Sequence, residues 1–413
     1  MTDTPSKAKP DKGQKTDFDI AIVGGGLTGL LAAVFIAQTV QSKPVSIALI
    51  RPETSKSDGR TTAMLMPSVK ILHECGLWDN LSDQSAPLKT MRLIDGSDRL
   101  FRAPVTEFKA GEIDLEAFGY NISNKALVKA LEDRITQLPG IKCFDGFVTS
   151  CETRKTHNCI HIDNDHFISV NLVVAADGHN SSMRKAAGIS WRYWSYPQSA
   201  LVLNFTHNLD HGFISTEFHT RTGPFTQVPL PAGKNNARRS GLVWVTTPRL
   251  AETIVTLPAD QLNQAVESKM QSLLGTVQCE TTPQKFPLSG GLAERLAARR
   301  IMLIGEAAHM FPPIGAQGFN LGVRDIIALR DVISQNSNDP GCDHALMDYN
   351  RARQRDIQLS TAGIDVLNRS LLTDFLPLQF LRSAGMATIG NISWFRKQVM
   401  KHGIGKRGRM LFS

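Results

Sequence analysis

The stretch that decides the fold is "DFDIAIVGGGLTGLLAAVFIA", residues 17–37. A short apolar run ends in three consecutive glycines, and a long apolar segment follows. The spacing G-x-G-x-x-G brings the backbone close to a pyrophosphate at its first two glycines, and its third lets a helix pack closely on a strand. The pattern predicts a strand, a tight loop and a helix whose N-terminal N–H groups face the phosphates of a dinucleotide. The predicted phosphate-binding residues are Gly24, Gly26, Leu27, Thr28 and Gly29.

A second strand is predicted over residues 45–50, and its end departs from the usual pattern. Folds of this kind carry an acidic residue there, which binds the adenosine ribose. Here Arg51 takes that position, followed by Pro52 and Glu53. We expect Arg51 at the cofactor and leave two interpretations open. Either Glu53 or backbone groups bind the ribose, or the arginine selects a 2'-phosphate, as in NADP.

Two further stretches offer polar contacts. In "DGRTTAM", Arg60 and Thr61 precede an amphipathic helix, so Arg60 either reaches a pyrophosphate or a polyol chain or is an ordinary loop residue. A buried strand pattern then ends in "ADG", with Asp177 at its centre. This carboxylate either caps the following helix or binds the cofactor, and the residues alone favour neither.

The loop "GEAAHMFPPIGAQGFN", residues 305–320, lies between an apolar strand pattern and an amphipathic helix pattern. Its acid is placed to accept hydrogen bonds from polyol hydroxyls, its prolines stiffen the loop, and its glycines permit close approach to a flat ring. The helix N-terminus would stabilise negative charge on the pyrimidine end of a flavin. The residues predicted to contact the cofactor are Gly305, Glu306, Pro313, Gly315, Gln317, Gly318, Phe319 and Asn320.

Between Trp191 and Trp244 the pattern changes to alternating apolar and polar residues with Gly-Pro and Asn breaks, which predicts antiparallel sheet. A sheet interposed in an α/β chain is a candidate for covering a substrate. His207, His211 and His219 lie here without ligand spacing, so no metal site is predicted. No G-x-S-x-G elbow is present, and no catalytic base can be named.

Three motifs in this order resemble the class A flavoprotein monooxygenases, the aromatic hydroxylases of the para-hydroxybenzoate hydroxylase type. They are G-x-G-x-x-G, "ADGHNSSMR" and "GEAAHMFPPIGAQGFN". Within that class the chain most resembles the ubiquinone-biosynthesis hydroxylases, over roughly residues 18–405. The supporting segments are "DGRTTAMLMPS", "GYNISNKALVKALE", "YPQSALV", "GPFTQVPLP", "QGFNLGVRDIIAL" and "YNRARQRD".

The resemblance implies an α/β fold: a Rossmann-like FAD-binding domain, an interposed antiparallel substrate sheet and a helical C-terminal region. We expect the FAD-binding domain in residues 18–90, 118–188 and 286–340, the substrate sheet in 91–117 and 189–285, and C-terminal helices with a basic tail in 341–413. Residues 1–17 are expected to be a disordered lead-in.

The resemblance also implies roles for single residues. The motif glycines hold the pyrophosphate, Arg60 and Asn124 flank the phosphates or ribityl chain, and Glu306 binds a ribityl hydroxyl. Asp177 marks a motif associated with both FAD and reduced nicotinamide, and residues 318–320 face the flavin. His309 is interpreted as fixing the loop, with acid–base catalysis as the alternative. Departures from the family pattern stand at Arg51, Glu306, Asn124 and Ala316.

By the same resemblance the chain is a monooxygenase that hydroxylates a polyprenylated phenol on the way to ubiquinone. It uses FAD, transiently bound NAD(P)H and dioxygen, through a C4a-hydroperoxyflavin. Two alternatives stay open: a flavin-dependent reductase of a prenyl lipid, and a non-catalytic FAD-containing subunit of a quinone-biosynthesis complex. The tryptophan motif of flavin halogenases is absent.

Bulk properties set limits on location and partners. The 413 residues carry a net charge of +8, and no stretch reaches the roughly 18 apolar residues of a membrane span. No secretory signal is found, and the six cysteines lack C-x-x-C and zinc spacing, so a cytoplasmic protein with free thiols is expected. Nucleic acid is not expected as a partner.

The C-terminal end has its own composition. After Asp374 there are seven bases and no acid, with apolar residues between them. This favours docking on an anionic inner-membrane surface, where other ubiquinone-biosynthesis proteins are candidate partners, while a tail packed loosely on the body is the alternative.

Overall fold

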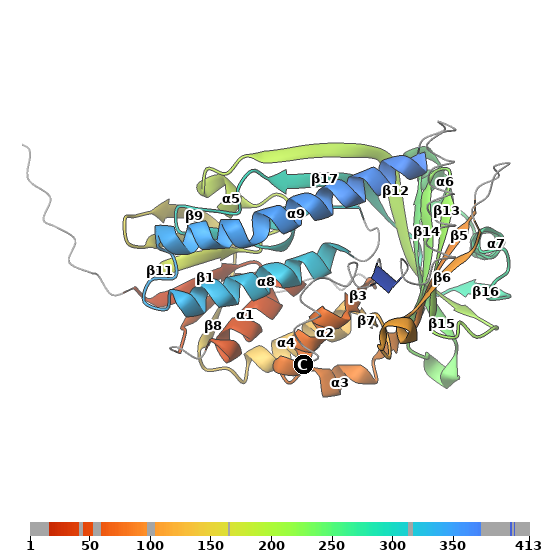
Figure 1. The fold of residues 1–413 in the computed structure, drawn as a ribbon, viewed down its shortest axis with the longest axis horizontal. Helices are drawn as coiled ribbons and strands as arrows, with labels where there is room; N and C mark the ends of the chain where they lie inside the picture. Colours follow the sequence, from red (N-terminus) through yellow and green to blue (C-terminus); the bar gives the residue numbers. More distant parts are fainter. Residues whose placement is uncertain are drawn as a thin grey trace, which may run out of the picture.

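The computed structural model describes residues 16–40, 44–52, 59–96, 104–163, 166–312 and 317–372, together with 397, 398 and 400. Glu53, Pro313, Gly315, Ala316 and most of the basic tail lie outside the described residues. Within them the predicted α/β fold is confirmed, because a largely parallel sheet covered by helices stands beside a large, mostly antiparallel sheet (Figure 1).

The first sheet is built around β1, which pairs in parallel with β11 on one side and β2 on the other. Its path runs β18-β19-β11-β1-β2-β8, with β9 and β10 attached through β11. Strands buried on both faces read as continuous apolar runs, as β1 and β2 do. The bounds are β1 (Phe18–Val23), β2 (Ile47–Arg51), β8 (Ile141–Asp145), β9 (Val148–Thr153), β10 (Asn158–Ile162), β11 (His166–Ala175), β18 (Ala297–Ala298) and β19 (Ile301–Leu303).

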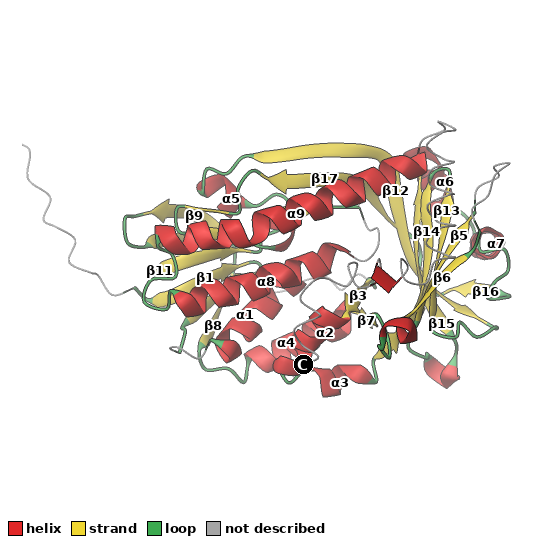
Figure 2. Ribbon diagram, viewed as in Figure 1, coloured by secondary structure: helices red, strands yellow, loops and turns green. Residues whose placement is uncertain are grey.

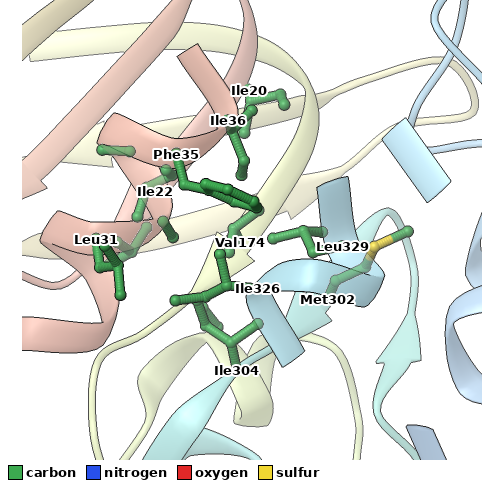
Figure 3. Close-up of a cluster of buried hydrophobic side chains, with 14 of the residues drawn as sticks. Ile20, Ile22, Leu31, Phe35, Ile36, Val174, Met302, Ile304, Ile326 and Leu329 are labelled. Carbon is green, nitrogen blue, oxygen red and sulfur yellow. The ribbon is translucent and has the colours of Figure 1, made fainter. Parts of the chain in front are cut away.

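The main core lies between this sheet and its helices. Figure 3 shows Phe35 of α1 among side chains of β1, β11, β19 and α8. Helix α1 is apolar on every face because the sheet, α4 and α8 surround it. The helices of this part are α1 (Leu27–Thr39), α2 (Met66–Glu74), α3 (Trp78–Ser82), α4 (Asn124–Ile135), α5 (Ser182–Ala186), η3 (Gly305–Ala307), α8 (Gln317–Gln335) and α9 (Asp343–Leu372).

The second sheet has the order β20-β17-β12-β15-β14-β13-β5-β6, with β16 paired to β12 (Figure 2). Its outer face packs on α6 and α7 in a separate core. The bounds are β5 (Thr90–Asp95), β6 (Thr106–Lys109), β12 (Trp191–His207), β13 (Ile214–Thr220), β14 (Gly223–Leu230), β15 (Arg239–Thr246), β16 (Val277–Cys279), β17 (Gln284–Ala293), β20 (His309–Met310), η1 (Ala110–Ile113), η2 (Lys234–Asn236), α6 (Pro248–Val255) and α7 (Ala259–Lys269).

The two sheets are joined by chain and by hydrogen bonds. A small sheet of β3 (Thr61–Leu65), β7 (Gly119–Ser123) and β4 (Ser85–Pro87) lies between them. Asn121 of β7 donates to the carbonyl of Pro229 at 2.9 Å, and Asn204 of β12 donates to that of Gly59 at 3.2 Å. Strand β17, most of which the sequence predicts to belong to the FAD-binding domain, pairs with β12 of the second sheet. The division of the chain into domains stays a prediction.

Candidate functional site

The glycine loop has the geometry that its spacing predicts. Gly24 has a φ of +125°, and a Cβ there would lie 2.2 Å from the carbonyl oxygen of Ala176. At Gly29 a Cβ would lie 2.1 Å from the carbonyl oxygen of Gly24, so helix and strand approach as closely as glycine allows. A Cβ on Gly26 would meet nothing within 4 Å. Gly26 therefore faces open space at the N-terminus of α1, where an anion binds well.

The glycine loop contacts both of the other motifs, and the third motif meets it at Thr28, the second residue of α1. A Cβ on Gly305, which has a φ of +58°, would lie 3.0 Å from the Thr28 side chain. One on Gly322, in the second turn of α8, would lie 3.4 Å from the same side chain. Gly24 in turn abuts Ala176, which immediately precedes Asp177. Segments separated by up to about 300 residues along the chain thus share one small region.

Arg51 lies at the carboxyl end of β2, packed against the glycine loop. A Cβ on Gly25 would lie 2.7 Å from the Cβ of Arg51. The Arg51 guanidinium pairs with Glu132 of α4, and its Nε is buried without a hydrogen-bond partner. An acid is therefore present beside the end of β2, but α4 supplies it rather than the strand.

Arg60 and Asn124 are neighbours in the structure. The Asn124 N–H donates to the Arg60 carbonyl at 3.0 Å, and Thr62 donates its hydroxyl to the Asn124 side chain at 2.7 Å. The Arg60 guanidinium lies over the ring of Phe286, 5.4 Å from its centre. Strand β3, which begins at Thr61, holds this corner against β7.

Asp177 fits both of its interpretations. One carboxylate oxygen accepts from the N–H of Met183 at 3.1 Å and from the hydroxyl of Ser182 at 3.2 Å, which ties it to the start of α5. The other oxygen is buried and has no hydrogen-bond partner. A buried carboxylate oxygen without a donor is expensive in a folded protein, so a ligand donor is a reasonable occupant.

Glu306 differs from the rest of its turn in its exposure to solvent. It is exposed, whereas Gly305, Ala307, Ala308 and His309 around it are all buried. The Arg184 guanidinium donates to the Ala307 carbonyl at 2.9 Å and to the His179 carbonyl at 2.7 Å, so it links the second and third motifs. A rigid buried turn therefore presents one carboxylate outward.

The N-terminus of α8 is anchored to β3 and α2 through Asn320. Its side-chain oxygen accepts from the N–H of Leu65 at 2.9 Å and from the hydroxyl of Ser68 at 2.7 Å, and its amide donates to the Ala63 carbonyl at 2.8 Å. The Asn320 side chain thus positions the helix end. The remaining predicted residues there, Gln317, Gly318 and Phe319, form the first turn of α8, and a Cβ on Gly318 would meet nothing within 4 Å.

Sequence reasoning missed a buried network behind this loop. Asp325 of α8 is fully buried and accepts from the Gly305 N–H at 3.0 Å, from His309 at 2.6 Å and from Arg353 of α9 at 2.8 Å. The Tyr349 hydroxyl donates to the Leu303 carbonyl at 2.8 Å. The available signal was an acid at an otherwise apolar helix face, in "NLGVRDIIAL".

The charges of this network reinforce one another. Burial alone would raise the pKa of Asp325, but His309 and Arg353 outweigh it and hold that pKa below its ordinary value. Burial likewise opposes the charge on Arg353, and Asp325 and Asp356 raise its pKa above the ordinary value. The Asp325–Arg353 pair therefore remains ionised.

The described residues contain no group of His, Cys, Asp and Glu side chains able to hold a metal ion. His219 in β13 contacts Glu217 at 2.9 Å, and His207 contacts Ser240 at 2.9 Å, so each belongs to a local hydrogen-bond pair. Among the described residues no helix is both long and apolar enough to cross a membrane.

The residues present fit a dinucleotide cofactor. The open N-terminus of α1 at Gly26, the partnerless oxygen of Asp177 and the outward carboxylate of Glu306 supply phosphate, polar and hydroxyl contacts around one region. Comparison with known proteins identifies the cofactor as FAD, because residues 17–362 match the family model described as FAD binding domain. The chain belongs to this FAD-binding family.

Relatives within the FAD-binding family indicate which class of enzyme the chain belongs to. The chain is 30% identical to the ubiquinone hydroxylase UbiL of Rhodospirillum rubrum, over 98% of this chain and 93% of the relative. It is 26% identical to the 3-demethoxyubiquinol 3-hydroxylase of Escherichia coli, over 94% and 98%. The resemblance to FAD-dependent ubiquinone-biosynthesis hydroxylases is confirmed, and this member of the family is a flavoprotein monooxygenase.

A solved structure agrees on the fold. The p-nitrophenol 4-monooxygenase PnpA of Pseudomonas putida superposes with a TM-score of 0.76 at 15% identity, covering 95% of this chain and 100% of that one. At such low identity the likeness concerns the fold alone.

Proposed function

We propose that this monooxygenase hydroxylates the aromatic ring of a polyprenylated phenol that is an intermediate of ubiquinone biosynthesis. Bound FAD supplies the redox chemistry: two electrons from NAD(P)H and one dioxygen give one oxygen atom on the ring and one water. The relatives named as ubiquinone hydroxylases support the substrate class. The observation that supports the flavin site is that the second motif abuts the glycine loop at Gly24, while the third motif meets it at Thr28, beside the outward carboxylate of Glu306.

In this proposal the chain's own residues bind and orient. Gly24 and Gly29 allow the tight turn and close packing that shape the loop, Gly26 leaves room for the pyrophosphate at the N-terminus of α1, and Glu306 accepts from ribityl hydroxyls. Gln317 to Asn320 place the N-terminus of α8 where negative charge develops on reduction, which stabilises it. Asp177 uses its partnerless oxygen for the cofactor while its other oxygen holds α5.

The test uses purified holoprotein and a short-chain prenylated phenol. We expect a yellow protein that consumes NADH or NADPH and dioxygen in equal amounts, with a product one oxygen atom heavier by mass spectrometry. A protein that stays colourless after reconstitution with FAD would contradict the flavin site. Reduction of the prenyl group without oxygen uptake would identify a reductase, and FAD that NAD(P)H never reduces would identify a non-catalytic subunit.

We also propose that the chain docks peripherally on an anionic membrane, where a polyprenylated substrate resides. The seven bases after Asp374, with no acid among them, support this. Of this region the structure describes Lys397, Gln398 and Met400, and Met400 is buried against Ala110, Ile113 and Phe118. The part of the tail beyond Met400 is therefore the proposed contact, and association with other ubiquinone-biosynthesis proteins is proposed at the same surface.

Vesicle sedimentation checks the docking proposal. Replacing Lys406, Arg407 and Arg409 with alanine leaves Met400 in place and should weaken binding to anionic vesicles roughly a hundredfold, at about 1 kcal/mol per base. Neutral vesicles serve as the control for charge. Equal binding of the triple variant and the wild type to anionic vesicles would remove the proposal while leaving the flavin chemistry untouched.

A further inference from the structure

The carboxylate of Asp325 holds both ends of the turn that carries Glu306. One of its oxygens accepts from the Gly305 N–H at 3.0 Å, at the start of the turn, and from the Nε2–H of His309 at 2.6 Å, at its end. Gly305 has a φ of +58°, so the turn leaves the strand through a conformation that favours glycine. Two hydrogen bonds to one oxygen therefore fix both ends of the five-residue turn, residues 305–309.

Helix α9, which follows α8 in the sequence, holds the Asp325 carboxylate in place. Arg353 of α9 donates through Nε to the other oxygen of Asp325 at 2.8 Å. The same guanidinium pairs with Asp356 and reaches the Leu321 carbonyl of α8 at 3.5 Å. Arg353 and Asp325 are both buried, so removing either partner would leave an uncompensated charge.

Only one residue of the clamped turn is exposed. The imidazole of His309 stacks on Phe311, with ring centres 5.4 Å apart and planes at 15°, and its backbone pairs with Leu292 of β17. The Ala307 carbonyl accepts from Arg184 on the opposite side. With its start, middle and end each held, the turn can present the Glu306 carboxylate in one place.

We propose that His309, held by Asp325, is a positioning residue that sets the location of the Glu306 carboxylate for the bound cofactor. This inference rests on the proposed FAD site and names a residue that acts on the cofactor through Glu306. His309 holds the turn through its Nε2–H, which a side chain that only fills space would not do. Because the proposed route to the cofactor runs through Glu306, the effect of His309 on FAD affinity should depend on the presence of the Glu306 side chain.

Two isosteric substitutions test the use of Nε2. The amide nitrogen of glutamine reaches the position of Nε2, whereas that of asparagine reaches only the position of Nδ1. H309Q should bind FAD within about threefold of wild type, and H309N should weaken binding roughly tenfold, which is about the effect of one hydrogen bond. Fluorescence titration of the apoproteins with FAD measures this, and thermal unfolding of the same apoproteins reports any general loss of structure.

A double-mutant cycle with E306A tests the route through Glu306. In the E306A background, H309N should cause no further loss of FAD affinity, because the group it positions is gone. An equal loss in both backgrounds overturns the proposal, as does equal affinity of H309Q and H309N. If the wild-type apoprotein does not bind FAD at all, the proposed function fails and the inference falls with it.

Discussion

At the scale of single residues, Gly24 and Gly26, the first two glycines of the G-x-G-x-x-G motif, serve different purposes. Gly24 is required by the fold, since its φ is +125° and a Cβ would lie 2.2 Å from a backbone oxygen. Gly26 has an extended backbone, with a φ of −74°, and open space around its Cβ position. The same motif therefore contains one glycine for folding and one for the ligand.

Alanine at each glycine should separate these roles. G24A should lower the free energy of unfolding of the apoprotein by about 3 kcal/mol, through backbone strain and overlap. G26A should change it by less than about 0.5 kcal/mol but weaken FAD binding roughly tenfold by crowding the phosphates. Urea unfolding and FAD titration measure the two effects. A destabilised G26A apoprotein, or one with wild-type FAD affinity, would contradict this division.

The sequence predicts some site residues well because their roles are local. The glycine spacing states the backbone geometry directly, and the structure agrees at Gly24 and Gly29. The Asp325–Arg353 pair could not be predicted in that way, since its partners lie on two helices, 28 residues apart, and meet only through packing. Arg51 is an intermediate case, because its departure was visible in the sequence but its partner Glu132 was not.

At the scale of elements, the local sequence predicts the start of a helix more closely than the extent of a strand. The Ser-Asn pair predicts the start of α4, and the Ser123 hydroxyl accepts from the Ala126 N–H at 3.2 Å as an N-cap. By contrast, β12 runs for 17 residues from Trp191 to His207. Its first half pairs only with β17, whereas its second half also pairs with β15. Such a long strand is a product of tertiary pairing, which a local pattern does not contain.

The end of β12 and the connection that follows it contain a pair of histidines, His207 and His211, with a predictable pH response. His207 donates through Nδ1 to the Leu209 carbonyl at 2.7 Å, and its ring lies 5.6 Å from that of His211. Burial lowers the pKa of both, and the nearby Arg238 lowers them further, while Asp210 opposes this. The folded state therefore binds fewer protons than the unfolded state as the pH falls below the ordinary histidine pKa.

Stability should accordingly decline on the acidic side of about pH 6.5, the ordinary histidine pKa, and be unaffected by these groups above it. H211Q should reduce this decline, because one of the two titrating groups is removed. Urea unfolding between pH 5 and 8 provides the measurement, with H344Q on the exposed face of α9 as the matched control. An H211Q protein with the full wild-type decline would show that the pair does not contribute.

At the scale of the whole molecule, the two largest apolar cores are separate from each other. The first core surrounds β1 and α1, and the second lies between the large sheet and helices α6 and α7. They are linked by β12 and β17, by the Asn121–Pro229 and Asn204–Gly59 hydrogen bonds, and by contacts of α9 with β14. Because of these links, we expect FAD bound at the first core to stabilise the second sheet, the proposed substrate wall, as well.

FAD should therefore protect both sheets from local unfolding. At a free concentration of 100 times its Kd, a ligand adds about 2.7 kcal/mol to the state that binds it. Hydrogen exchange should show slower exchange with FAD in peptides from β1 and also in peptides from β14. N121A removes the bond to Pro229 and should reduce the gain in β14 while leaving that in β1. N336A, which removes a side-chain bond of the same length to the Val332 carbonyl at the C-terminal end of α8, should change neither. Protection confined to β1 in the wild type would mean that the substrate sheet opens independently of the cofactor.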